Sequence, residues 1–208
     1  MFTGTLGTMN ERMTRLMTGS ALLWMVVGIS VAIYLEIVCA GTVHQTFSEY
    51  VHTGQGARLA GVAMLAIGFA SLAAAGALWS VGGPRSAYWL ILVWGIGLAV
   101  LAIFPQEPAD QALTWHGAIH RHAALAGLIT LPLAGLLLSR QWPLLRPSCI
   151  ASFVALVVFV LTFVVPGWRG YSGLVERFVL GVDIGIIAVL IRRLIAVPAA
   201  VFRTEQPS

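Results

Sequence analysis

Charged residues are scarce in this chain of 208 residues: 10% are charged, whereas 59% are hydrophobic. A soluble domain carries about 25% charged residues, so the eight acids and twelve bases present are too few to cover a water-exposed surface. Lysine is absent, since all twelve bases are arginine, and the mean hydropathy is +0.90. The composition therefore excludes a soluble globular domain, a disordered chain and a disulfide scaffold, and indicates lipid as the main solvent.

Cysteine is rare, and the common catalytic signatures are missing. Cys39 and Cys149 are the two cysteines, without CxxC or any metal-ligand spacing, and we interpret both as apolar side chains within helices. No phosphate loop, dinucleotide fingerprint, nucleophile elbow or CxxCH haem site is present. The arginines stand singly or in pairs between apolar runs and form no basic patch. The sequence thus predicts no cofactor and no nucleic-acid partner.

Long apolar runs dominate what is present. Each has roughly the 20 residues that cross a hydrocarbon core, and none alternates with period two, so each predicts an α-helix. The runs are Ser20–Ala40, Ala57–Val81, Ser86–Phe104, His116–Leu138, Ser148–Val165 and Ser172–Val197. We predict an all-α, polytopic membrane protein, with residues 1–208 forming one domain of six transmembrane helices in a single bundle.

The ends of the chain and the small residues give further expectations. The first run is longer than the core of a signal peptide and contains Glu36, which favours an uncleaved helix. We expect short polar tails at Met1–Asn10 and Thr204–Ser208. Small residues let transmembrane helices approach closely; the sequence has Ala66, Ala70 and Ala74 at four-residue spacing and a GxxxG at Gly181 and Gly185. We expect the GxxxG to join helices within this chain.

The placement of arginine predicts the orientation. With six crossings, both termini share a side with the loops around Pro84 and Trp142; eight arginines lie there, against four on the other side. The positive-inside rule then places both termini in the cytoplasm. The other polar groups gather on or near the outward side, namely His44, His52, His116, His120, His122, Glu49, Glu107, Asp110 and Glu176. A functional site is therefore expected to open outward.

Two acids lie within the predicted spans. Asp183 is eleven residues into the last span, roughly 16 Å deep at a rise of 1.5 Å per residue, where a charge costs on the order of 3 kcal/mol. Glu36 lies one turn from the outward end of the first span. Intramembrane acids often carry function, so both are candidate catalytic acids. The alternatives are that Asp183 bonds to a neighbouring helix and that Glu36 reaches the interface.

Histidine and arginine residues mark the outward ends of two spans. His116 and His120 are four residues apart and share a helix face, as two metal ligands would, but zinc would need a third ligand such as Glu36, Asp110, Glu176 or Asp183. A pair bonded to the outer loops is the main alternative, and we expect no metal. For Arg121 and Arg177, snorkelling to headgroup phosphates is the main expectation; pairing with Glu107 or Asp110, or binding an anionic headgroup, are the alternatives.

Four short motifs occur in order along the chain: Thr46–Tyr50 (TFSEY), Phe104-Pro105, His116-Gly117-x-x-His120 and Gly173–Arg177 (GLVER). Together they resemble the six-helix bacterial membrane family catalogued as domain of unknown function 998, over roughly Ser20 to Leu194. Members of that family often carry an Asp shortly after the Phe-Pro, whereas Glu107 and Asp110 straddle that position here. The resemblance implies a fold and a location in the bacterial cytoplasmic (inner) membrane. It implies no settled reaction.

Three functional hypotheses follow. The first is a protein whose outward polar pocket binds a membrane lipid by its headgroup, a small amphiphilic ligand or a membrane-protein partner, through Glu49, Tyr50, Arg121, Glu176 and Arg177. The second is an intramembrane enzyme that modifies a lipid or isoprenoid, with Glu36 or Asp183 as acid and His120 as base, or with a metal on His116 and His120. The third is a small proton-coupled transporter using Asp183, against which stands the lack of inverted repeats.

Overall fold

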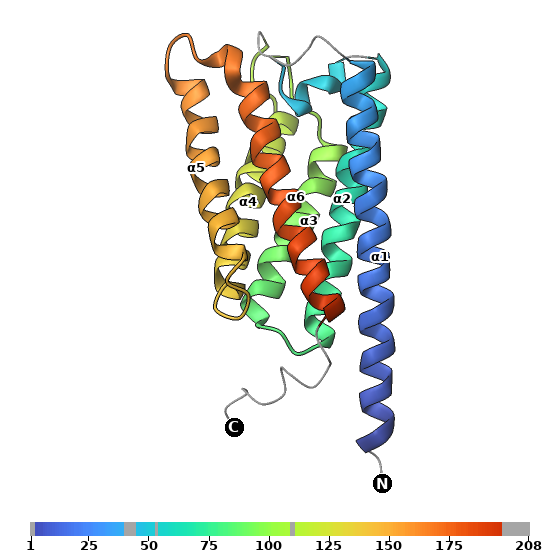
Figure 1. Cartoon of the computed structure of the whole chain (residues 1–208). Helices are drawn as coiled ribbons and strands as arrows, with labels where there is room; N and C mark the ends of the chain where they lie inside the picture. The colour runs from blue at the N-terminus through green and yellow to red at the C-terminus, as the bar shows by residue number, and fades with distance from the viewer. Residues whose placement is uncertain (1–2, 40–44, 53, 109–110, 197–208) are drawn as a thin grey trace.

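The computed structural model describes residues 3–39, 45–52, 54–108 and 111–196. Within these ranges the chain is helical throughout and contains no strand (Figure 1). The α-helices are α1 (Thr3–Val38), α2 (Gly54–Ser80), α3 (Arg85–Ile103), α4 (Trp115–Leu138), α5 (Leu145–Val164) and α6 (Ser172–Ala196). Two short 3₁₀ helices, η1 (Phe47–His52) and η2 (Arg169–Tyr171), precede α2 and α6.

The helix boundaries follow the apolar runs except at the start of α1. Both ends of α2 to α6 lie within three residues of the predicted positions. Most of the polar tail expected at Met1–Asn10 is helical, because α1 already begins at Thr3, and the tail expected at Thr204–Ser208 lies outside the described residues. Polar residues continue this helix: Arg15 pairs with Glu11 one turn earlier, and the Thr18 hydroxyl donates to the Thr14 carbonyl. Hydropathy therefore predicts the limits of the apolar run, whereas α1 extends beyond that run into polar sequence.

Five helices, α1 to α5, are long and apolar enough to cross a membrane, so the chain is a multi-pass membrane protein. The apolar stretch of α1 is Glu11–Val38. The sixth helix differs only in its charges, since every stretch of 18 residues within it holds at least three of them: Glu176, Arg177, Asp183, Arg192 and Arg193. The first turn of α1 and the last turn of α6 lie toward the same end of the molecule, and η1 and η2 lie toward the other (Figure 1).

Small residues set the helix packing only in part. Ala66, Ala70 and Ala74 are buried, and α2 packs against both α1 and α3, which confirms this stripe as a contact surface. The expectation for the GxxxG of α6 is wrong: a Cβ atom added at Gly181 or Gly185 would meet no other atom within 4 Å. No helix of the described chain therefore packs closely against these two glycines.

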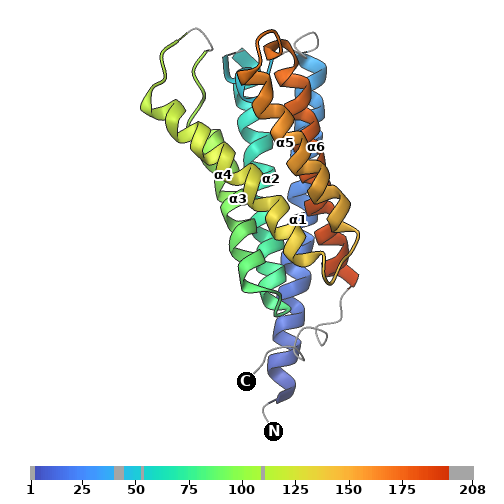
Figure 2. The ribbon, with the colours of Figure 1, turned by 90° about the vertical axis from the view of Figure 1, so that its left-hand side faces the viewer.

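The helices do not stay together along their whole length. Turned by 90°, the molecule shows α4 leaning away from α5 and α6 at the end that carries η1 (Figure 2). At the opposite end α4 and α5 are joined by a short connection and lie in contact. The two sides diverge toward the end where the sequence concentrates polar residues.

Candidate functional site

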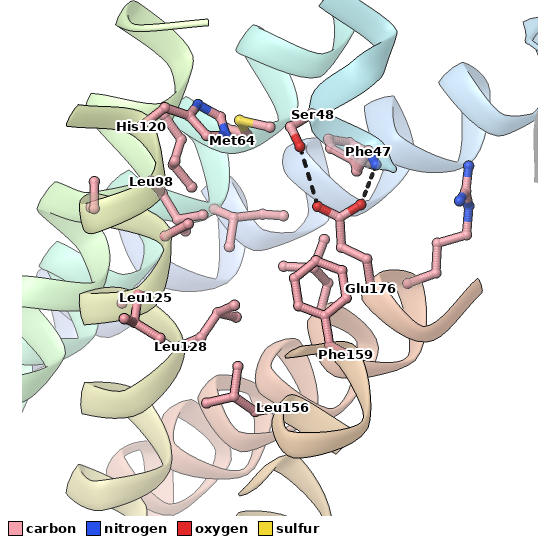
Figure 3. A pocket seen from close by; sticks show the side chains of 18 of the residues that line it. Phe47, Ser48, Met64, Leu98, His120, Leu125, Leu128, Leu156, Phe159 and Glu176 are labelled. Carbon is pink, nitrogen blue, oxygen red and sulfur yellow. Dashed lines mark hydrogen bonds between the residues drawn. The ribbon is translucent and has the colours of Figure 1, made fainter. Parts of the chain in front are cut away.

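A cavity of about 840 Å³ occupies this region and is lined by residues from all six α-helices and from η1. Its size lies within the range of roughly 300–1,000 Å³ typical of small-molecule sites. Most of the lining is apolar, for example Ile67, Trp94, Leu98, Leu128 and Phe159 (Figure 3). The polar lining residues all lie toward η1; this polar end consists of Glu36, Ser48, Gln106, His120, Arg121, Arg169, Glu176 and Arg177.

Arg177 is the centre of a network that ties three elements together at the polar end. Its Nε donates to Glu36 Oε1 at 2.9 Å, and its Nη2 donates to the Tyr50 hydroxyl. Tyr50 in turn donates to Glu36 Oε2 at 3.1 Å. Arg177 Nη1 also donates to the carbonyls of Gln45 and Gly173. The network joins α1, η1 and α6, so the expectation that Arg177 snorkels to headgroup phosphates is wrong, because Glu36 and Tyr50 hold it within the protein.

Glu176 holds η1 over the cavity. Its carboxylate accepts from the backbone N–H of Phe47, the first residue of η1, and from the Ser48 hydroxyl at 3.5 Å (Figure 3). The first N–H groups of a helix lack intrahelical partners, which is why a carboxylate from α6 is well matched there. Ser48 also bonds Gln106 Oε1 at 3.3 Å, so η1 contacts the loop after α3 as well.

Glu49 and Arg169 connect η1 with η2. Glu49 accepts from the backbone N–H of Thr46 at 2.7 Å and from Arg169 Nη2 at 3.2 Å. The Arg169 guanidinium also lies 4.3 Å from the centre of the Phe163 ring, a distance at which the ring face attracts a cation. Arg169 therefore lines the cavity, whereas Glu49 is not part of the lining and contacts it through Arg169.

The two histidines of the HxxxH motif lie in different environments. His120 is buried, lines the cavity and bonds the Phe104 carbonyl through Nδ1 at 2.8 Å. Since a carbonyl only accepts, Nδ1 carries the proton. His116 is exposed, and its ring centre lies 3.5 Å from that of Trp115. The described residues hold no group of three His, Cys, Asp or Glu side chains that would hold a metal ion, and His44 and Asp110 lie outside those residues.

Asp183 lies apart from the cavity. It is completely buried in α6, and its Oδ1 accepts from the Ser152 hydroxyl of α5 at 2.6 Å. Its Oδ2 has no hydrogen-bond partner among the described residues. Asp183 is absent from the cavity lining, so the geometry does not bring it together with His120. The arrangement matches the alternative in which Asp183 links two neighbouring helices.

Sequence reasoning overlooked the role of Glu107. Its Oε1 accepts from the backbone N–H of Thr114 at 3.1 Å, from the Thr114 hydroxyl, and from the N–H of Gly117 at 3.0 Å. Gly117 leaves room for this carboxylate, because a Cβ atom there would collide with it. Glu107 therefore fixes the first turn of α4, and the proposed pairing with Arg121 is wrong. The threonine before Trp-His-Gly is the one sequence signal for this helix start.

The hydrogen bond from the Thr114 hydroxyl, followed by those from backbone groups, lowers the pKa of Glu107 from 4.5 to about 2. Because the folded pKa is depressed, the carboxylate stabilises the fold above pH 4.5, and this contribution is lost as the pH falls toward 2. We expect Glu107→Gln to unfold at a lower temperature than the wild type at about pH 7 and to converge with it only below about pH 2.

Thermal unfolding of the purified protein followed by circular dichroism across this pH range measures the effect. Glu11→Gln is the matched control, because it removes an exposed acid near the start of α1, far from Glu107 in the sequence. This variant should keep the pH dependence of the wild type. Parallel curves for wild type and Glu107→Gln would show that the helix start does not depend on this carboxylate.

The four motifs identified in the sequence meet at the polar end of the cavity. Ser48 and Tyr50 come from the first, the Phe104 carbonyl from the second, His120 from the third, and Glu176 with Arg177 from the fourth. The apolar wall was not predicted, because Leu128 or Phe159 has the same sequence pattern as any lipid-facing or core residue. Gln106 was also missed, since an isolated glutamine in a loop carries no signal.

Comparison with known proteins identifies one family. The family described as "protein of unknown function (DUF998)" matches residues 17–193. That range includes all four motifs and every residue of the polar end. No curated protein and no solved structure matches the chain.

Proposed function

Starting from the fact that the chain belongs to the DUF998 family, we propose that it binds an amphiphile inside the membrane, with the tail among the apolar walls of the cavity and the headgroup at the polar end. The observation that carries this proposal is the sorting of the lining: polar residues at one end and apolar residues along the rest. A ligand that is apolar over most of its length and polar at one tip matches that sorting.

A lipid-like ligand would reach this cavity from the side. Leu125 of α4 and Val160 and Phe163 of α5 line the cavity and are 47%, 45% and 45% exposed, respectively. They lie on the two helices that diverge in Figure 2. In a membrane this opening would face acyl chains rather than water, which supports passage of an amphiphile between bilayer and cavity.

The proposal includes a topology. All six α-helices cross the inner membrane of a bacterium as one bundle, with both termini in the cytoplasm and the polar end of the cavity outward. The eight arginines on the side of the termini, against four on the other, support this orientation. The shared end of the first turn of α1 and the last turn of α6 agrees with an even number of crossings (Figure 1).

No contact of the described acids or of His120 specifically favours the enzyme or the transporter hypothesis. Glu36 of α1 lines the cavity, and both of its carboxylate oxygens accept hydrogen bonds, from Arg177 and Tyr50. Glu176 and His120 are each bonded to backbone groups, and Asp183 is outside the lining. Binding without chemistry therefore describes the cavity better than acid–base catalysis or proton coupling.

Filling the cavity tests the proposal. Gly181 lines the cavity, and a Cβ atom there would meet nothing within 4 Å, so we expect Gly181→Phe to add its ring to the cavity. Gly185→Phe is the matched control, because Gly185 lies one turn further along α6, is equally open and does not line the cavity. Native mass spectrometry of the purified proteins measures the lipid that remains bound.

We expect lipid binding to weaken about tenfold in Gly181→Phe, the effect of about 1.4 kcal/mol of binding free energy, and to stay at the wild-type level in Gly185→Phe. Equal occupancy in all three proteins would contradict the proposal.

A further inference from the structure

We infer that the amphiphile carries an anionic, phosphate-like headgroup, recognised by Arg121 and Gln106; this inference rests on the proposed function above. At the polar end, some charged and hydrogen-bonding groups have partners within the protein, whereas others have none among the described residues. Those without a partner lie on the cavity wall.

The two carboxylates that line the polar end, Glu36 and Glu176, have protein donors, and so does Glu49 beside it. Both oxygens of Glu36 accept, from Arg177 and Tyr50. Glu176 accepts from Phe47 N–H, and its other oxygen shares the single Ser48 hydroxyl proton with Gln106 Oε1. Both oxygens of Glu49 accept as well, from Arg169 and Thr46 N–H. A cationic headgroup would have to compete with these donors for each carboxylate.

Two donor groups at the polar end have no partner among the residues that the structure describes. Arg169 and Arg177 are ion-paired, but Arg121, which lines the cavity from α4, forms no ion pair or hydrogen bond with another described residue. The side-chain amide of Gln106 uses its oxygen to accept from Ser48, and its NH₂ group has no acceptor among the same residues. Both residues line the polar end.

The chemistry of these donors selects the headgroup. A guanidinium offers a planar fork of N–H donors that matches the oxygens of a phosphate or carboxylate. The amide NH₂ adds two further donors and no charge. An uncharged headgroup that covered Arg121 would desolvate the guanidinium without supplying an anion, which is unfavourable. A phosphate monoester, which has acceptor oxygens in excess, satisfies both residues.

The experiment compares probes that share one chain and differ in their headgroup. Hexadecyl phosphate, hexadecanol and hexadecyltrimethylammonium, together with inorganic phosphate alone, are bound to the full-length protein in a nonionic detergent, and each Kd is measured by isothermal titration calorimetry. The variants are Arg121→Gln and Arg58→Gln. Arg58 is an exposed arginine in the second turn of α2 that does not line the cavity, which makes Arg58→Gln the matched control.

We expect hexadecyl phosphate to bind about tenfold more tightly than hexadecanol and than the ammonium probe, the effect of one charge-assisted hydrogen-bonded contact. Arg121→Gln should remove this preference, whereas Arg58→Gln should keep it. Because Arg121 is exposed, its replacement is not expected to unfold the protein, and an unchanged unfolding temperature, followed by circular dichroism, serves as the folding control.

Every other result contradicts either the anionic headgroup or the proposed function. Equal Kd values for the phosphate, alcohol and ammonium probes, all weakened by Gly181→Phe, would overturn the anionic headgroup and leave the proposed function standing. Inorganic phosphate binding as tightly as hexadecyl phosphate would show a free anion in place of an amphiphile. Probe binding that Gly181→Phe does not change would overturn the proposed function itself.

Discussion

Replacing Arg177 with methionine is expected to lower the free energy of unfolding by about 2 kcal/mol, less than the roughly 3–5 kcal/mol for breaking a fully buried ion pair. The discount reflects side-chain exposures of 19% for Arg177 and 35% for Glu36. Methionine keeps the apolar stem of the residue, but it leaves Glu36 without a cation and removes the guanidinium donor of the Gln45 carbonyl. Reversible unfolding in mixed micelles of a mild detergent and dodecyl sulfate, followed by circular dichroism, measures the loss.

Two further variants identify the cause of the effect. Arg15→Met removes the other arginine that pairs with a glutamate of α1, but the side chains of Arg15 and Glu11 are 79% and 51% exposed; it should cost less than about 0.5 kcal/mol. The double variant Glu36→Met, Arg177→Met removes both charges together and should recover part of the loss. A loss in Arg177→Met no larger than that in Arg15→Met would contradict a structural role for the network.

The helix boundaries were predictable from sequence where lipid determines the composition. The ends of α2 to α5 coincide with changes from apolar to polar residues, because an unpaired backbone group in lipid is costly and an apolar run must be helical. The start of α1 could not be found in this way. Thr3–Asn10 is polar yet helical, and polar residues outside the hydrocarbon core are compatible with either helix or coil.

The polar end of the cavity was predictable as a set of residues but not as a set of contacts. Orientation and motif order already grouped Tyr50, His120, Glu176 and Arg177 on one side. The partner of Arg177, however, is Glu36 of α1, which is 141 positions away in the sequence. No spacing within a helix predicts such a contact, because it depends on how α1 and α6 pack. The side chain of Glu36 was therefore interpreted as an isolated intramembrane acid.

The GxxxG motif shows why a local pattern gives an ambiguous prediction. Small residues at four-residue spacing allow close approach of helices, but the same spacing also removes side chains from a surface. In α2 the stripe of Ala66, Ala70 and Ala74 is buried against neighbouring helices. In α6 the equivalent spacing leaves Gly181 on the cavity wall, where the missing side chain adds volume to the cavity.

Ser152→Ala is expected to lower the free energy of unfolding by about 2 kcal/mol, the cost of leaving a buried polar group without its partner. Ser152 supplies the one side-chain hydrogen bond that the structure gives to the fully buried Asp183, at 2.6 Å and between α5 and α6. Without it, neither carboxyl oxygen would have a partner among the described side chains. Unfolding in the same mixed micelles measures the change.

Thr162→Val is the matched control for this prediction. Thr162 is also a buried hydroxyl of α5, but it donates to the Phe159 carbonyl within its own helix. Its removal should cost less than about 1 kcal/mol, because the carbonyl keeps its backbone donor and valine fills nearly the same space. The double variant Ser152→Ala, Asp183→Leu removes both polar groups and should restore most of the stability. If Ser152→Ala and Thr162→Val cost the same, the bond to Asp183 does not hold α5 against α6, and the buried acid requires a different partner.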